Sequence, residues 1–286
     1  MVQEAGCEGL PQRLDTELEA RIGGGQLLIP VLPAVASTVL GMIDDPDAEI
    51  ARLALTIQHD PAIAGHVMRV ANSASLRGGA PIVSLQQAIT RLGMRSIADI
   101  ALAACMGPAL FNAPRHAALV ARIWSESLAT ALWSREIARA LRRNVEVAFL
   151  SGLMHQIGKP VLLQALQEML PGQGEQLGEP LLLALLERHA AAAGLAVARH
   201  WHLPEPVAET IAHLGDFSRS ARAPDLVAMV SVAHAVALQT LGEGMMDAQP
   251  LMELPEMVEI NLYLADAQAL LGKVDSVRAM LNEIAA

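Results

Sequence analysis

Aromatic residues and cysteines are scarce in this chain of 286 residues, which has three Trp, three Phe, one Tyr and two Cys. Two cysteines give neither a disulfide framework nor the spacing of a metal clip, and a chain of this length buries enough surface to fold without either. Few rings are available to stack on bases, and the net charge of -10 repels phosphate backbones. We therefore expect no direct contact with nucleic acid.

Charged residues are also few, at 17% against 53% hydrophobic residues, and the mean hydropathy is +0.37. This composition is typical of a folded globular protein. Charge, Gly or Pro interrupts each apolar stretch before the roughly 18 to 20 residues that a spanning helix needs, so we expect no membrane span. The first 20 residues carry five acidic side chains, unlike a secretory signal. We expect a cytoplasmic protein.

Apolar positions recur at intervals of three and four, which predicts helices throughout and no strand. We therefore expect an all-α fold with two helical lobes. We predict an N-terminal extension with a short helix over residues 1–26 and a C-terminal helical extension over residues 242–286. Between them we predict a central domain over residues 27–241. Its two lobes span residues 27–110 and 114–241 and divide near residues 108–114.

Several residues indicate where helices begin and end. Asp60-Pro61 is typical of a helix start, because the carboxylate accepts free amide hydrogens and proline needs none. Ser84 and Gln87 match a capping box, and Gly93 suits a helix stop in the left-handed conformation. Asn144 is a further cap.

The second half of the chain contains longer apolar segments. Residues 115–143 run without a helix breaker and predict the longest helix, whereas residues 171–180 predict a loop. After this loop we expect separate helices over 181–186 and 190–201, then two more before residue 242. The glycines in the loop lack the strand and the Lys-Ser/Thr pair of a phosphate-binding loop, so we interpret them as a connection.

The most informative segment is Gly-Leu-Met-His-Gln-Ile-Gly-Lys at residues 152–159. It resembles the helix end Gly-Leu-Leu-His-Asp-Ile-Gly-Lys of the HD phosphohydrolase superfamily, in which a His-Asp pair binds metal. Further fragments follow in order over residues 27–241 and together resemble the HDOD family, the HD-related output domain of bacterial signalling proteins. These are Leu32-Pro33, Asp60-Pro61, Asn72-Ser73, Leu92-Gly93, Trp124, Gly158, His189, Trp201 to Pro204 and His213.

The resemblance implies a degenerate metal site. In HD enzymes a separate His, the His-Asp pair and a later Asp hold the ions that activate water and clamp a phosphate ester. At the matching positions this chain has Glu126, His155 followed by Gln156, and His234. A neutral amide cannot supply the anionic bridge between two metal ions. The resemblance therefore implies that hydrolysis is lost and that no cofactor is needed.

An alternative stays open, because Glu126, His155 and His234 could still hold a metal ion: two His and a carboxylate form a known catalytic zinc set. The wider pocket that the resemblance implies, for a possible ligand, adds four residues. Among them Lys159 is a candidate phosphate ligand or an ordinary solvated cation. The complete predicted pocket is Glu126, His155, Gln156, Lys159, His189, His213 and His234.

The other motif residues favour structural interpretations. Asp60 and Pro61 are chiefly a helix start, and Gly93 a helix stop. Asn72 and Ser73 could contact a ligand, but a local polar bridge from helix end to the next turn is favoured. Cys105 lies in an apolar run that should raise its pKa, so we expect no catalytic cysteine.

Three functions remain to be distinguished. The first is a non-catalytic regulatory adaptor that binds a protein partner or small ligand in a cyclic di-GMP or two-component network. The second is a metal-dependent phosphohydrolase with a rearranged ligand set, in which metal would be lost on replacing His155. The third, a nucleotide sensor without turnover, would show ligand-dependent thermal stabilisation. The sequence specifies neither the partner nor the oligomeric state.

Overall fold

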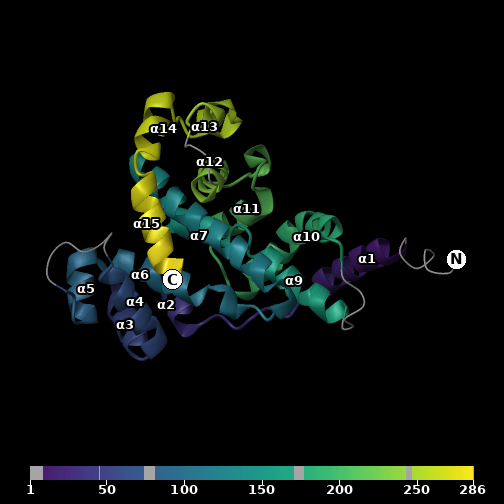
Figure 1. Cartoon of the computed structure of the whole chain (residues 1–286), viewed down its shortest axis with the longest axis horizontal. Helices are drawn as coiled ribbons and strands as arrows, with labels where there is room; N and C mark the ends of the chain where they lie inside the picture. The colour runs from purple at the N-terminus through teal and green to yellow at the C-terminus, as the bar shows by residue number, and fades with distance from the viewer. Residues whose placement is uncertain (1–8, 45, 74–80, 171–176, 243–246, 286) are drawn as a thin grey trace.

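The computed structural model of the chain describes residues 9–44, 46–73, 81–170, 177–242 and 247–285. Within these ranges every regular element is a helix, either α or short 3-10, and no strand is present (Figure 1). The predicted all-α class is therefore confirmed.

The first lobe consists of five helices that pack largely against one another, seen at the lower left of Figure 1. They are α2 (Ala34–Asp44), α3 (Pro46–Gln58), α4 (Pro61–Ala71), α5 (Leu85–Leu92) and α6 (Met94–Cys105). Asp60 caps α4 as predicted: its Oδ1 accepts hydrogen bonds from the backbone N–H of Ala62 and Ile63, both at 3.1 Å. Pro61 is the first helical residue.

Local bonds fix the turns of this lobe. Asn72 Nδ2 donates to the carbonyl of Ile82 and Asn72 Oδ1 accepts from its N–H, both at 2.8 Å, which is the polar bridge that we predicted. Ser84 Oγ accepts from Gln87 N at 3.2 Å. Gly93 does end α5, but its φ of 81° and ψ of 151° lie outside the left-handed helical region that we expected, in a conformation that favours glycine.

The second lobe contains α7 (Ala117–Ala140), α8 (Val145–Met154), α9 (Gly158–Met169), α10 (Glu179–His200), α11 (Glu205–His213) and α12 (Pro224–Leu241). Helix α7 is the longest, as predicted, and packs between α8 and α12. It begins later than expected, because Pro114–His116 forms a 3-10 turn. Its Trp133 is fully buried, and the indole Nε1 donates to Thr240 Oγ1 at 2.8 Å.

The prediction of two helices over 181–201 is wrong, because α10 is one continuous helix. No proline or glycine separates the two segments, and the polar residues between them lie in mid-helix, where they pair with side chains of other helices. Residues 171–176 of the predicted loop, including its first glycines, lie outside the described residues.

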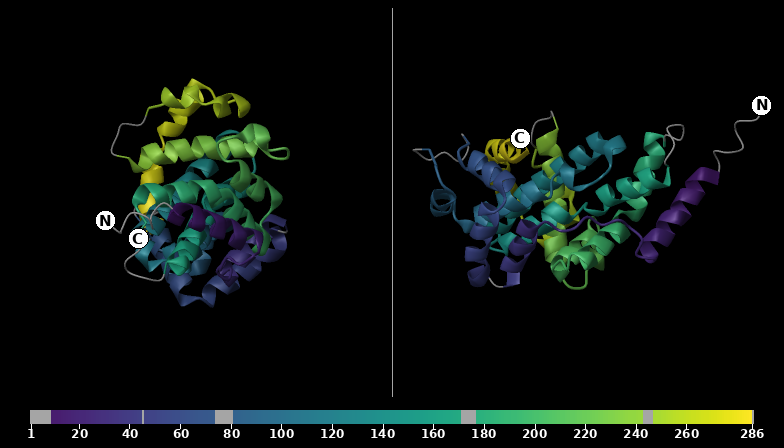
Figure 2. Two further views of the ribbon diagram at one scale, coloured as in Figure 1. Left: turned by 90° about the vertical axis from the view of Figure 1, so that its right-hand side faces the viewer. Right: turned by 90° about the horizontal axis from the view of Figure 1, so that it is seen from below.

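The terminal extensions pack on the two lobes. Helix α1 (Gly9–Gly23) lies against α9 and α10, apart from the first lobe (Figure 2). At the other end, α13 (Pro255–Glu259), α14 (Leu264–Leu271) and α15 (Val274–Ala285) give three helices where we expected at least one. Helix α15 contacts α7 of the second lobe and α4 and α6 of the first. The C-terminal extension thus joins the two lobes.

By length and composition alone, α10 and α12 are apolar enough to cross a membrane. The sequence prediction that charge, Gly or Pro interrupts each apolar stretch too early for a span did not identify these two helices. In the structure, 44% of the apolar window of α10 and 50% of that of α12 is buried against the rest of the molecule. Core helices of globular proteins pass the same test.

Candidate functional site

The predicted centre lies where α8 ends. His155 and Gln156 follow α8 directly and form the turn that leads into α9. Two glycines place this turn. A Cβ on Gly152 would lie 2.7 Å from the Cα of Ala131, so α8 passes very close to α7. A Cβ on Gly158 would lie 2.1 Å from the carbonyl oxygen of Ala190, so α9 starts against α10.

His155 is buried and has both ring nitrogens engaged. Its Nδ1 lies 2.7 Å from the carbonyl oxygen of Gly152. Because a carbonyl only accepts, Nδ1 carries the proton and Nε2 is left as an acceptor. Nε2 lies 3.0 Å from Nε2 of Gln156, which donates to it. The nitrogen that could bind a metal is therefore already hydrogen-bonded.

Gln156 is buried and joins two of the predicted site residues. Its amide nitrogen, 3.0 Å from His155 Nε2, also donates to Glu126 Oε2 of α7 at 3.4 Å. Both partners are acceptors, which fixes the amide with its nitrogen toward them. The N–H groups of Gln156 thus satisfy the two ligand atoms that a cation would otherwise bind.

His234 of α12 completes this group. Its ring packs edge-on against that of His155, with centroids 4.8 Å apart and planes at 61°. Thr130 Oγ1 lies 3.3 Å from His234 Nδ1 and donates to the backbone carbonyl of Glu126 at 2.7 Å. Thr130 was not among the predicted site residues, although it lies one helical turn after Glu126 and hence on the same face of α7.

Burial keeps both imidazoles neutral. It lowers the pKa of His155 to about 3, with a smaller contribution from His234; the hydrogen bond to Gly152 opposes the shift, and Lys159 adds to it. Burial also lowers the pKa of His234, against the opposing charge of Glu126. Both imidazoles are therefore uncharged at neutral pH.

Lys159 lies in the first turn of α9, and its Nζ lies 2.6 Å from Glu187 Oε1 of α10. The lysine side chain is only 18% exposed, so it is not the solvated cation that we considered. The ammonium group of Lys159 pairs with the carboxylate of Glu187, so it does not face an open site for a phosphate ligand.

Two of the predicted pocket residues are not joined to this group. His189 of α10 turns toward α1, where its Nε2 lies 2.7 Å from Asp15 Oδ1. His213 ends α11, and among the described residues no hydrogen bond or ring contact joins it to His155. The structure therefore brings together Glu126, His155, Gln156 and His234, with Lys159 nearby.

Metal-ligating atoms converge at a different place. Within the described part of the chain, the one trio of side chains with ligand atoms within 4.8 Å of one another is Asp15, Glu19 and His189. Arg188 already pairs with Asp15 at 3.0 Å and Glu19 at 3.3 Å. The alternative set of Glu126, His155 and His234 is not so arranged, and Gln156 binds two of its three members. These residues do not fit the metal that the HD superfamily uses.

The remaining motif residues lie around this centre or in the first lobe. Trp124 and Gln156 line a cavity of about 20 Å³, and the indole Nε1 is buried without a hydrogen-bond partner among the described residues. Ser73 is buried at the end of α4, next to the bridge that Asn72 makes. Burial raises the pKa of Cys105 to about 12, as expected for an unreactive thiol.

This arrangement defines an HD-related, all-α domain whose helix end lacks the paired aspartate. The model of the HDOD domain family matches residues 29–217, more than half of the chain. The chain therefore belongs to the HDOD family.

Solved structures share this fold. An HDOD domain protein from Geobacter sulfurreducens superimposes with a TM-score of 0.71 at 23% identity, covering 95% of this chain and 99% of that one. A protein from Shewanella amazonensis SB2B, whose name proposes a metal-dependent phosphohydrolase, has a TM-score of 0.69 at 23% identity, covering 96% and 98%. At these identities the likeness shows the fold alone.

A relative is also found by sequence. An uncharacterized protein of Treponema pallidum (strain Nichols) is 26% identical over 208 residues, which is 70% of this chain and 40% of the relative. The chain thus spans less than half the length of that protein.

Proposed function

We propose that this protein is a non-catalytic regulatory module of bacterial signalling, which acts by binding a protein partner or a small ligand and not by turnover. The observation that supports it is the amide of Gln156, which donates to both His155 Nε2 and Glu126 Oε2. Hydrolysis in HD enzymes depends on bound metal ions that lower the pKa of a water molecule. Here a neutral side chain engages the atoms that would hold such an ion.

Membership of the HDOD family supports the regulatory part of this proposal. A protein from Marinobacter aquaeolei VT8, whose name proposes signal transduction, has a TM-score of 0.65 at 17% identity, covering 97% of this chain and 66% of that one. By analogy, the partner belongs to a cyclic di-GMP or two-component network. Fold-level analogy is an associational argument, so function must be tested at the site.

Turnover is the direct test. We expect the purified full chain, supplied with Mn²⁺, Ni²⁺ or Zn²⁺, to hydrolyse bis-p-nitrophenyl phosphate and cyclic di-GMP no faster than buffer containing the same ion. The matched variant His155→Ala should give the same background rate. Hydrolysis above background by the wild-type chain, abolished in His155→Ala, would contradict the proposal and support the metal-dependent phosphohydrolase.

A further inference from the structure

A second candidate site lies between the lobes, away from His155. A cavity of about 150 Å³ opens between α2 and α6 of the first lobe and α8 of the second. Six of its lining side chains are apolar, two from each of these helices. Four lining residues are polar, namely Arg95 and Asp99 of α6, Asn144, and Glu146 of α8. Nothing in the degenerate HD centre accounts for this cavity.

Each of the two carboxylates of the cavity has one cationic partner, which compensates its charge only in part. Glu146 Oε1 is buried and accepts no aligned hydrogen bond, although Arg95 Nε lies 2.7 Å away. The Arg95 side chain is 75% exposed, so solvent screens its ion pair with Glu146. Asp99 has one long contact, 3.4 Å from its Oδ2 to Arg135 Nη1. Burial raises the pKa of Asp99 to about 6, which is the signature of an undercompensated carboxylate.

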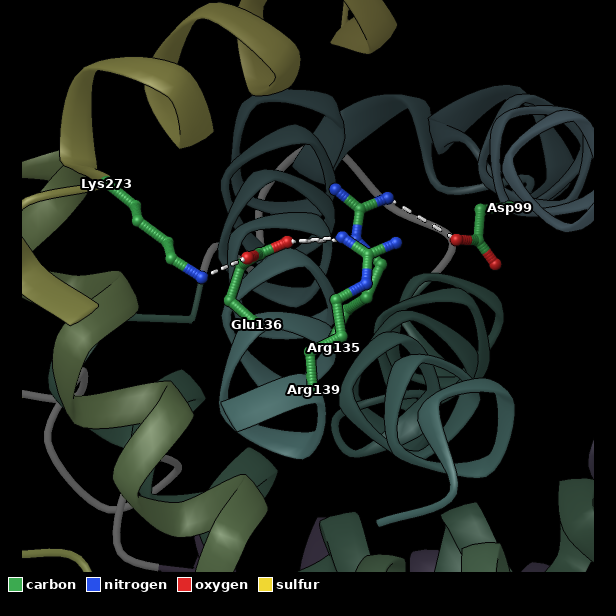
Figure 3. A network of polar contacts seen from close by, with 5 residues as sticks. All are labelled: Asp99, Arg135, Glu136, Arg139 and Lys273. Carbon is green, nitrogen blue, oxygen red and sulfur yellow. Dashed lines mark hydrogen bonds and ion pairs between the residues drawn. The ribbon is translucent and has the colours of Figure 1, made fainter. Parts of the chain in front are cut away.

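The nearest buried cation, Arg135, compensates the charge of Asp99 only in part. Figure 3 shows Arg135 reaching toward Asp99 from α7, next to Glu136 on the same helix. Arg135 Nε lies 3.6 Å from Glu136 Oε1, so its charge is shared between two carboxylates. Arg139 at 2.7 Å and Lys273 at 2.8 Å also pair with Glu136. Arg139 and Lys273 thus pair with Glu136, and Arg135 divides its charge between Glu136 and Asp99.

We propose that the cavity between α2, α6 and α8 binds a small organic ammonium or amidinium ion whose compact apolar body lies among the aliphatic and aromatic side chains. The charged head would donate to Asp99 and Glu146, where charge-assisted hydrogen bonds are strongest. An engineered apolar cavity of about 150 Å³ in another protein takes benzene. The expected body therefore has about six carbon atoms. An anion of the same shape would meet two carboxylates against the single guanidinium of Arg95, and its binding would be disfavoured.

The test uses the full chain and three probes of nearly equal shape, namely benzylamine, benzyl alcohol and benzoate. We expect benzylamine to raise the melting temperature in a saturable manner near neutral pH, because a ligand of the folded state alone stabilises it. Benzyl alcohol should bind at least about tenfold more weakly by calorimetry, and benzoate should cause no shift. Equal shifts with all three probes, or none with benzylamine, would overturn the proposal.

Variants locate the binding. Ala98→Leu places a larger side chain in the cavity, and Glu146→Gln removes one carboxylate while keeping its shape. Each should weaken benzylamine binding by at least about tenfold, whereas the exposed Glu259→Gln on α13 controls for the loss of one negative charge and should bind as the wild type. If Ala98→Leu fails to fold, the affinity of Glu146→Gln for benzylamine still tests whether the ligand binds in this cavity. Wild-type affinity in Glu146→Gln would contradict the assigned site.

Discussion

We expect Gly158→Ala to cost more than about 4 kcal/mol in the free energy of unfolding and to leave the chain largely unfolded. The added Cβ would lie 2.1 Å from the carbonyl oxygen of Ala190 and 2.6 Å from the backbone nitrogen of Gly194. Both atoms belong to the backbone of α10, so no side chain can rotate away. The start of α9 would have to separate from α10 and take the turn at His155 with it.

Gly65→Ala is the matched control. Gly65 lies inside α4, and a Cβ there would meet nothing within 4 Å. Alanine is favoured over glycine within a helix, so this variant should gain about 0.5 to 1 kcal/mol. Urea unfolding followed by far-ultraviolet circular dichroism measures both. A Gly158→Ala protein within about 1 kcal/mol of the wild type would show that the close approach of α9 and α10 is wrong.

The second large effect is a loss of stability in acid caused by His155. The imidazole has its ordinary pKa of 6.5 in the unfolded chain and about 3 in the folded protein, because burial disfavours its charged form. Between these values the unfolded state binds the proton and the folded state does not. The stabilisation is therefore complete above pH 6.5 and is lost as the pH falls toward 3. From pH 7 to pH 4 this one group should cost about 3 kcal/mol.

His155→Asn removes the titrating group. We expect the wild type to be the more stable protein at neutral pH and its advantage to shrink by about 3 kcal/mol at pH 4, measured as unfolding free energies in urea. Gly65→Ala changes no titratable group, so its difference from the wild type should stay constant over the same range. Parallel pH profiles of wild type and His155→Asn would contradict a buried, neutral imidazole.

Short-range features could be predicted from the sequence. Asp60 and Asn72 were identified correctly as a helix cap and a polar bridge, because a cap acts within its own turn and Asn72 closes a short connection. The extent of α10 was not predicted, since its polar middle resembles a break until Glu187 and His189 are seen to pair with other helices.

The site itself was only partly predictable. The family resemblance grouped His155 with Glu126 and His234, from helices far apart in sequence, and the ring contact and hydrogen bonds bear this grouping out. The same resemblance was wrong to place His189 in the pocket with His155. No periodicity shows which way α10 turns that side chain, and its partner Asp15 lies in α1, before the residues that the family model matches. The bridging role of the Gln156 amide depends on a side-chain orientation that no sequence pattern gives.

The most direct test of the central claim, that the Gln156 amide takes the place of a metal ion, is metal content. We would incubate the full chain with iron, manganese, nickel or zinc, remove unbound ions by gel filtration, and count the metal retained per chain in wild type and His155→Ala. The account predicts the same trace amount in both proteins, with any residual metal assigned to Asp15, Glu19 and His189 by its loss in Asp15→Asn. Stoichiometric metal in the wild type that disappears in His155→Ala would contradict it.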